Sequence, residues 1–204
     1  MKKIFLAIFL LSGTICGFAQ QKSILNKQEK DAILYMREEE KLARDIYNLL
    51  YDKWEINPFD NIRQSEQIHM DRMKTLITTY QLEDPVTKNN DKPGVFTNIL
   101  LQQYYNELSI SGSNSLIDAL KAGAKIEELD IADIEERIKQ TGRQDIVSSY
   151  NFLKMASENH LRAFVRRLKM QGIIYEPVIL SKTEFEKIIV SEEARGRNGG
   201  RGWN

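Results

Sequence analysis

Long stretches without glycine or proline are the feature that most constrains the fold of this chain. From about Lys27 to Trp54 the sequence has neither residue, and apolar side chains recur along it at helical spacing. Glycine and proline are the residues least compatible with a helix interior, so this stretch favours one long α-helix. Pro58 stops that helix, within a turn over residues 56–60.

Three further long helices are expected from the same pattern. We predict them at about residues 60–80, 113–139 and 145–171, the last ending before Gly172. Gly123 and a break near Asp130 weaken the expectation for the third of these. The second and third helices are separated by a loop over residues 81–94, with two prolines, and by a short helix over residues 95–108.

The order of these segments predicts an all-α fold. We expect an antiparallel four-helix bundle over residues 28–172, with one long crossover between its second and third helices. That connectivity is typical of ferritin-like folds, and no fixed period supports a helical repeat array. Residues 173–190 begin in an extended conformation and then form a short helix, opened by a capping box at Ser181. We expect this extension to pack on the bundle, and the Gly/Arg-rich tail over residues 191–204 to be disordered.

The first residues have the features of a signal peptide. Lys2 and Lys3 precede a short apolar run over residues 4–11, and small residues surround a cleavage position after Ala19. We therefore expect residues 1–19 to be removed and the protein to be exported, to the periplasm or outside the cell. The apolar run is too short to span a bilayer, so no membrane span is expected after cleavage.

Composition narrows the choice of partners and ligands. The 29 basic and 29 acidic residues balance, which gives no electrostatic reason to expect nucleic acid as a partner. The one cysteine, Cys16, lies within the expected signal peptide. Any metal site in the mature chain must therefore use carboxylates and imidazoles, which suit iron or manganese and leave zinc open.

A glutamate and a histidine lie on the apolar stripe of the second helix. Glu66 and His69 are three residues apart, so both side chains can reach one point. Burying them is costly unless they are paired or bound to a metal. Glu-x-x-His is the arrangement by which helical bundles hold di-iron or di-manganese centres. A hydrogen-bonded Glu–His pair is the simpler alternative. The stripe itself is formed by Phe59, Ile62, Met73, Leu76, Ile77 and Tyr80.

The other helices offer inward polar residues at a similar depth. Glu127 lies at the centre of the third helix's stripe, and His160 lies on the inner face of the fourth. On the first helix the phase favours Glu39 over Glu40, although a run of glutamates is often a solvated surface. The predicted metal ligands are Glu40, Glu66, His69, Glu127 and His160, with Glu39 and Glu158 as alternatives.

Two motifs resemble those of rubrerythrins within the ferritin-like superfamily. Residues 40–47 (EKLARDIY) are similar to the first-helix motif Glu-x-x-Ala-Arg-x-x-Tyr, and residues 59–69 are similar to the second-helix motif. The ordered set EEEKLARDIY, SEQIHMD, GAKIEELDI and SENHLRAF resembles more closely the ferritin-like family DUF2202, over about residues 28–190. The resemblance implies a ferritin-like bundle with Glu40 as the first-helix ligand, and it implies no established reaction.

The chain departs from the di-iron pattern in two ways. Ser157 stands where the fourth helix should have a glutamate, so either Glu158 turns inward or the second metal lacks a carboxylate, giving an asymmetric or mononuclear site. The predicted helix lengths also offset Glu40 from Glu66 by about 10 Å along the bundle axis, at about 1.5 Å per residue. That offset argues against a standard di-iron geometry.

The sequence leaves three functions open. The first is a di-iron centre that reacts with O₂ or peroxide or oxidises iron, with Tyr47 and Tyr150 as hydrogen-bond donors beside the ligands. The second is metal binding or delivery without turnover, since the chain has no cysteine-rich rubredoxin module. The third is a structural bundle whose polar core sets helix register. Enzyme activity, the electron donor and the oligomeric state, including a homodimer, are not decided by the sequence.

Overall fold

Helices account for all the regular structure in the computed structural model, which describes residues 24–198, with side chains for residues 24–190. No strand occurs among those residues, so the all-α prediction is confirmed. The predicted signal peptide, residues 1–19, lies outside the described residues. The helices are α1 (Lys27–Trp54), α2 (Phe59–Thr79), α3 (Pro85–Lys88), α4 (Ile99–Ser111), α5 (Leu116–Lys139), α6 (Gln144–Met170) and α7 (Lys182–Asn198).

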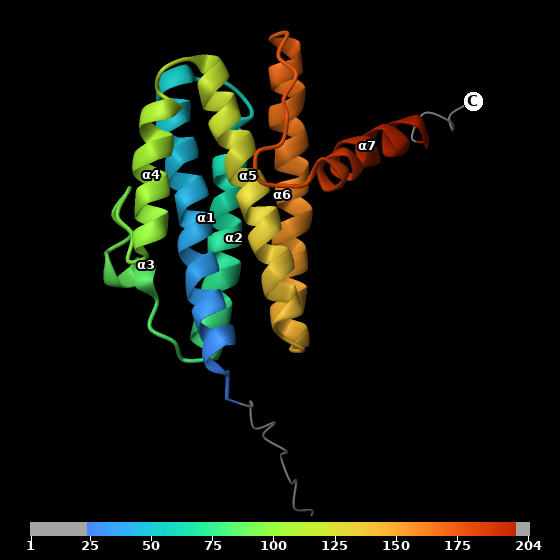
Figure 1. The fold of residues 1–204 in the computed structure, drawn as a ribbon. Helices are drawn as coiled ribbons and strands as arrows, with labels where there is room; N and C mark the ends of the chain where they lie inside the picture. Colours follow the sequence, from blue (N-terminus) through green and yellow to red (C-terminus); the bar gives the residue numbers. More distant parts are fainter. Residues whose placement is uncertain (1–23, 199–204) are drawn as a thin grey trace, which may run out of the picture.

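Helices α1 and α2 form an antiparallel pair (Figure 1). A capping box opens α1, because the Asn26 and Glu29 side chains each accept the other residue's backbone N–H. Glu55 ends α1 in the left-handed conformation, with φ 49°, and α2 begins directly after Pro58. Both helices have the bounds that the proline and the periodicity predicted, to within a residue.

The crossover between α2 and α5 contains two helices. One turn of helix, α3, lies inside the predicted loop over residues 81–94, capped by the side chain of Asp84. The predicted helix over residues 95–108 is α4, which starts later because the Asn98 side chain accepts the N–H groups of Leu100 and Leu101.

Helix α4 packs beside α1 (Figure 1). The carboxylate of Glu38, on α1, accepts the backbone N–H of Thr97 at 2.5 Å and of Asn98 at 3.0 Å. These two bonds tie the start of α4 to α1. They also explain why Glu38, the first residue of the glutamate run, is buried without facing the centre of the molecule.

Helices α5 and α6 form the second antiparallel pair. Helix α5 runs unbroken through Asp130, so the predicted break there is wrong. Gly123 has a packing role instead: a Cβ at this position would lie 2.4 Å from the ring of Phe164 on α6. The glycine lets that ring lie directly against α5, which stabilises the pair.

The segment after α6 returns along α5 and is held by one carboxylate. Glu128, fully buried on α5, accepts the hydroxyl of Tyr175 at 2.7 Å. The same carboxylate accepts the backbone N–H groups of Val178, Ile179 and Leu180 at 3.0, 2.7 and 2.8 Å. The extended segment is therefore fixed to α5 by a single buried glutamate.

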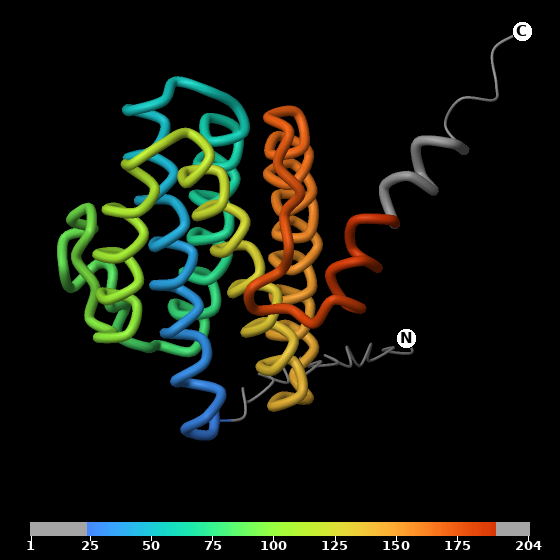
Figure 2. Tube along the Cα trace, turned by 45° about the horizontal axis from the view of Figure 1, so that its top comes forward, coloured from blue at the N-terminus to red at the C-terminus, as the bar shows by residue number. Residues whose placement is uncertain are grey.

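Helix α7 opens at the predicted capping box, where Ser181 and Glu184 exchange hydrogen bonds. Its first turns bury Phe185 and Ile188, and its axis then leaves the body of the molecule (Figure 2). The helix backbone extends to Asn198, but the predicted disordered tail lies outside the residues whose side chains are described. No helix in the described part of the chain is long and apolar enough to cross a membrane.

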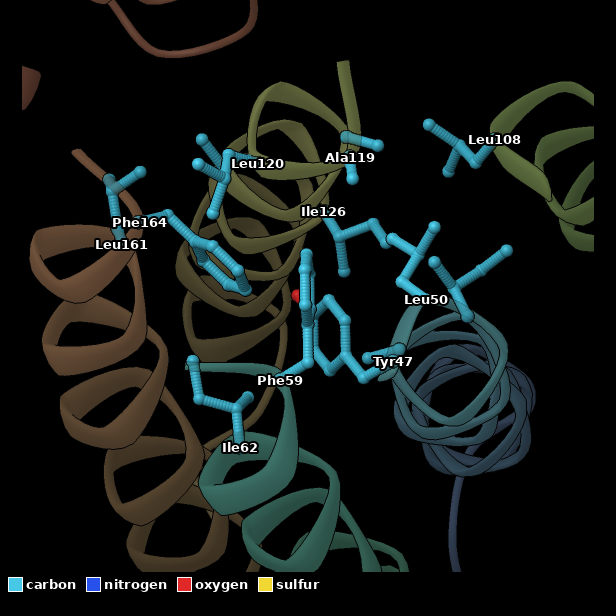
Figure 3. Close-up of a cluster of buried hydrophobic side chains, with 14 of the residues drawn as sticks. Tyr47, Leu50, Phe59, Ile62, Leu108, Ala119, Leu120, Ile126, Leu161 and Phe164 are labelled. Carbon is cyan, nitrogen blue, oxygen red and sulfur yellow. The ribbon is translucent and has the colours of Figure 1, made fainter. Parts of the chain in front are cut away.

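Two apolar clusters lie between the long helices. One contains the aromatic side chains Tyr47, Phe59 and Phe164, which meet from α1, α2 and α6 (Figure 3). The other contains Ile33 and Met36 from the first half of α1, with partners from α2, α5 and α6. Between these two levels α1 has buried glutamates. The polar residues of the interior are therefore enclosed between two hydrophobic layers.

Candidate metal centre

Glu66 lies at the middle of the buried polar residues. Its side chain, on α2, is 0% exposed. Oε2 lies 2.7 Å from Nδ1 of His69, one turn along the same helix. Oε1 lies 2.9 Å from Nδ1 of His160, on α6. The two oxygens of one carboxylate therefore face two different imidazoles, whose rings are stacked with centroids 5.6 Å apart.

Each imidazole has a further carboxylate beside it. Oε2 of Glu40, on α1, lies 3.1 Å from Nδ1 of His69, and Oε2 of Glu127, on α5, lies 3.5 Å from Nδ1 of His160. Two groups of three result, one with Glu40 and one with Glu127, and both include Glu66. Within each group the ligand atoms all lie within 4.8 Å of one another. The structure thus brings together the five residues predicted as ligands.

The predicted axial offset between Glu40 and Glu66 is wrong. Both carboxylates lie against the same nitrogen of His69. Helix α1 continues past the level where α2 begins, and Trp54 at its end donates a hydrogen bond to the carbonyl of Gly112, after α4. The linking residues 55–58 can return the chain by about 10 Å, since an extended residue spans about 3.5 Å.

Several buried polar atoms of this site have no hydrogen-bond partner among the described residues. They are Oε1 of Glu40, Oε1 of Glu66, Oε2 of Glu127, Nδ1 of His160 and both carboxylate oxygens of Asp130. Nδ1 of His160 and Oε1 of Glu66 lie 2.9 Å apart as an ion pair, without a hydrogen bond between them. Buried polar atoms are almost always paired. Carboxylate oxygens and imidazole nitrogens that converge without partners fit the donor set of iron, manganese or zinc.

Asp130 is a buried carboxylate beside the two groups of three that the sequence analysis missed. It lies one turn after Glu127 on α5 and is 0% exposed. Burial raises the pKa of Asp130 well above its usual value, and the charges of Glu40 and Glu39 raise it further. The spacing Glu-x-x-Asp on the apolar stripe was the available signal, because it repeats the Glu-x-x-His spacing of α2.

Helix α6, the fourth of the predicted long helices, contributes one imidazole and no carboxylate to the two groups of three. Ser157 is buried, and its hydroxyl donates to the carbonyl of Leu153 on its own helix. Glu158 is 27% exposed and lies 3.8 Å from Lys154, so its side chain does not turn inward. Helix α6 therefore offers His160 alone to the two groups of three.

Glu39 is fully buried but belongs to neither group of three. Asp133 on α5 is the side chain whose charge acts most strongly on it. The helix phase correctly placed Glu39 inside the molecule. Glu40, one residue on, is the one whose carboxylate reaches His69, as the rubrerythrin-like motif implied.

Two groups orient the candidate ligands from outside. The hydroxyl of Tyr47 donates to Oε1 of Glu127 at 2.5 Å, and Oγ of Ser65 lies 3.3 Å from Nε2 of His69. Such contacts fix the direction of a metal ligand. Tyr150 does not act in this way. It lies in the second apolar cluster, and its hydroxyl has no hydrogen-bond partner among the described residues.

The charges of the site are balanced by protons when no metal is bound. Burial lowers the pKa of both imidazoles, but the adjacent carboxylates outweigh it and raise His69 to about 11 and His160 to about 10. Burial raises the pKa of Glu40 to about 8. Burial also acts to raise the pKa of Glu66, but the two imidazoles outweigh it, so that this pKa falls below its usual value. A bound cation would displace these protons.

Comparisons with known proteins place the chain in a family. A family model described as an uncharacterized protein domain, DUF2202, matches residues 29–192. "Uncharacterized protein MJ0754" of Methanocaldococcus jannaschii is 48% identical over 177 residues, covering 87% of this chain and 95% of that protein. The crystal structure of hypothetical protein MJ0754 from Methanococcus jannaschii DSM 2661 superposes with a TM-score of 0.80, at 48% identity, over 83% of this chain and 95% of that one. The chain therefore belongs to the DUF2202 family, as its four motifs predicted.

Proposed function

We propose that this protein is a ferritin-like antiparallel four-helix bundle that binds a dinuclear metal centre. Helices α1, α2, α5 and α6 form the bundle, and each contributes a ligand from mid-length. Glu40, Glu66 and His69 hold one metal ion, and Glu66, Glu127 and His160 hold the other. Iron is the proposed metal, and manganese or zinc fits the same donors.

One observation carries the proposal, namely the position of Glu66 between two histidines. Its two oxygens lie 2.7 and 2.9 Å from two different Nδ1 atoms. A structural Glu–His pair needs one carboxylate and one imidazole. It does not require a second imidazole, two further buried carboxylates and several oxygens without partners. A carboxylate that bridges two metal ions accounts for all of these features together.

The proposed activity is redox chemistry linked to O₂ or peroxide, or the oxidation of iron. A pair of ferrous ions would supply the electrons. The protein would hold the ligands at fixed positions, orient Glu127 through Tyr47, and exclude bulk water by the apolar layers on either side. The imidazole of His160 keeps 12% of its surface exposed, so the α2–α6 side is the side on which small molecules would reach the centre.

Metal content tests the proposal directly. Mature protein is loaded with Fe(II) under anaerobic conditions, desalted and analysed for iron, beside Glu66→Ala, His69→Ala and Glu158→Ala. We expect about two iron ions per chain in the parent, none in Glu66→Ala and about one in His69→Ala. Glu158→Ala is the matched control and should keep both, because its side chain lies at the surface. A parent protein without iron would contradict the proposal.

A second function, metal binding or delivery without turnover, is favoured by the incomplete ligand motif of α6, where Ser157 bonds to its own helix and Glu158 lies beside Lys154. The amount of oxidant consumed separates the two. Catalysis would consume many equivalents of peroxide per iron in the presence of a reductant, whereas a binding protein would consume oxidant once.

We also propose export of the protein, which rests on the features of residues 1–19. N-terminal sequencing of protein expressed from the full gene should begin at Gln20. A chain that still begins at Met1 would contradict export by this signal.

A further inference from the structure

Beyond the proposed ligands, three buried or half-buried carboxylates lie between α1 and α5. We infer that Asp133, Glu39 and Asp130 form an uptake route by which a hydrated divalent cation passes from the α1–α5 surface to the metal centre. The inference rests on the proposed dinuclear centre. It assigns a function to buried side chains that the centre itself leaves unused.

The outer end of the route is an open hollow. It has a volume of about 820 Å³ and is lined by side chains of α1, α5 and the crossover, among them Tyr35, Glu38 and Arg137. Asp133 is 28% exposed and pairs with Arg137, which lines this hollow. Nη1 of Arg137 lies 3.2 Å from its Oδ1, and the guanidinium of Arg137 stacks on Tyr35 at 4.1 Å. A cation arriving from solvent would therefore compete with Arg137 for Asp133.

The middle of the route is Glu39. Its side chain is 0% exposed, and neither carboxylate oxygen has a hydrogen-bond partner. Asp133 is its strongest charged neighbour. Two carboxylates cannot hydrogen-bond to each other unless one of them is protonated. A divalent cation satisfies both, so this pair suits a transient cation position.

The inner end of the route is Asp130. It lies one turn before Asp133 on α5, is 0% exposed and again has two oxygens without partners. The charges that act most strongly on it are those of Glu40 and Glu39. Because Glu40 is a proposed ligand, Asp130 connects the route to the centre. The three carboxylates thus lead from a half-buried residue to a neighbour of the first proposed metal position.

The arrangement favours passage rather than storage. Among the described residues, only two groups of three ligands converge within 4.8 Å, and both are at the centre. Along the route the side chains offer carboxylates in pairs, which bind a divalent cation weakly and release it. The opposite side of the molecule, at His160, presents an imidazole and no carboxylate of either group to solvent.

Uptake kinetics test the route. Anaerobic Co(II) is mixed with metal-free protein, and its ligand-field absorbance is followed by stopped flow to the end point. We expect Glu39→Gln and Asp133→Asn to slow uptake by about 10-fold or more, with the final Co(II) content unchanged. Glu135→Gln is the matched control, since Glu135 is a carboxylate of α5 with 34% exposure that pairs with Lys154, off the route. Arg137→Gln should speed uptake, which keeps the test decisive if Glu39→Gln does not fold.

Three other outcomes would each overturn the route or the metal centre. Unchanged uptake rates with normal Co(II) content would overturn the route and leave the centre intact. A reduced Co(II) content in Glu39→Gln, with a normal rate, would make Glu39 a ligand and also overturn the route. A parent protein that binds no Co(II) would overturn the dinuclear centre itself.

Discussion

The hydroxyl of Tyr47 donates a hydrogen bond of 2.5 Å to Oε1 of Glu127, which links the aromatic core to the candidate metal centre. The ring of Tyr47 lies against Phe59 and Phe164, with centroids 6.1 and 5.4 Å away. Those contacts hold the phenol in place. Glu127 is thereby turned so that its other oxygen faces His160.

Tyr47→Phe should weaken metal binding more than it weakens the fold. The substitution keeps the ring contacts but removes the hydrogen-bond donor to Glu127. Loss of such a hydrogen bond to a metal ligand typically lowers the metal affinity by about 10–100-fold. Competition with a chelator of known affinity measures the change. Tyr150→Phe is the control and should leave the affinity unchanged. Equal affinities in the parent and in Tyr47→Phe would show that Glu127 is not held by this bond.

Asp130→Asn should separate stability from metal binding. Burial disfavours the charge of Asp130, and no hydrogen bond compensates. An amide of the same shape should therefore leave the melting temperature of the metal-free protein unchanged or higher. The melting-temperature gain on adding Fe(II) or Mn(II) should stay the same, because Asp130 belongs to neither group of three. A lower melting temperature without metal would indicate that Asp130 stabilises the fold directly.

The stability of the metal-free protein should fall as pH rises from about 6 to 9. The folded state retains a proton on Glu40 up to its pKa of about 8, whereas the unfolded chain loses that proton near 4.5. His69 and His160 remain protonated in the folded state up to about 11 and 10, against 6.5 in the unfolded chain. A folded state that binds more protons loses stability with rising pH.

Thermal unfolding with a chelator present checks this pH dependence. We expect the melting temperature to drop by more than about 5 °C between pH 6 and pH 9. Metal should reverse the trend, because a cation replaces the protons and its binding strengthens as pH rises. A melting temperature that rises over this range without metal would contradict the assigned protonation.

Substitution of two adjacent glutamates on α5 should have different effects, since Glu128 supports stability and Glu127 supports metal binding. Glu128→Ala removes the acceptor of three backbone N–H groups and of the Tyr175 hydroxyl. Hydrogen bonds to a charged group contribute about 1.5–3 kcal/mol each. Val178 and Ile179 are exposed, so water can replace part of the lost bonds, and the free energy of unfolding should fall by at least about 3 kcal/mol. Metal content should stay normal. Glu127→Ala should lose metal instead.

Denaturant unfolding and hydrogen exchange distinguish these two effects. In Glu128→Ala the amides of residues 178–180 should lose their protection from exchange, while those of α2 keep theirs. A free energy of unfolding within about 1 kcal/mol of the parent would mean that the segment after α6 is held by its apolar contacts alone.

The long helices were predictable because local signals define them. The start of α1 and its end before Pro58 follow from a capping box and a proline, both visible in the sequence. The crossover was less predictable, since the start of α4 depends on Asn98 and on the buried carboxylate of Glu38. That carboxylate acts on residues far along the chain, which periodicity does not reveal.

The candidate site was predictable where ligands share a helix face, as Glu66 and His69 do. Asp130 was missed because a helix break was expected near it, although its spacing from Glu127 is that of a ligand pair. The role of Glu128 could not be predicted, because its partners follow α6 and return only in the folded chain. The predicted axial offset between Glu40 and Glu66 was wrong because it was calculated from helix lengths alone. It left out the linking residues 55–58, which return the chain along the bundle axis.

Diffraction from crystals loaded with Fe(II), measured across the iron absorption edge, locates the metal ions that Glu66 is proposed to hold. We expect two anomalous peaks about 3.5–4 Å apart, the usual separation in two-metal sites. One should lie between Glu40 and His69, the other between Glu127 and His160, with Glu66 contacting both. A single peak, or peaks only at surface carboxylates, would contradict a dinuclear centre bridged by Glu66.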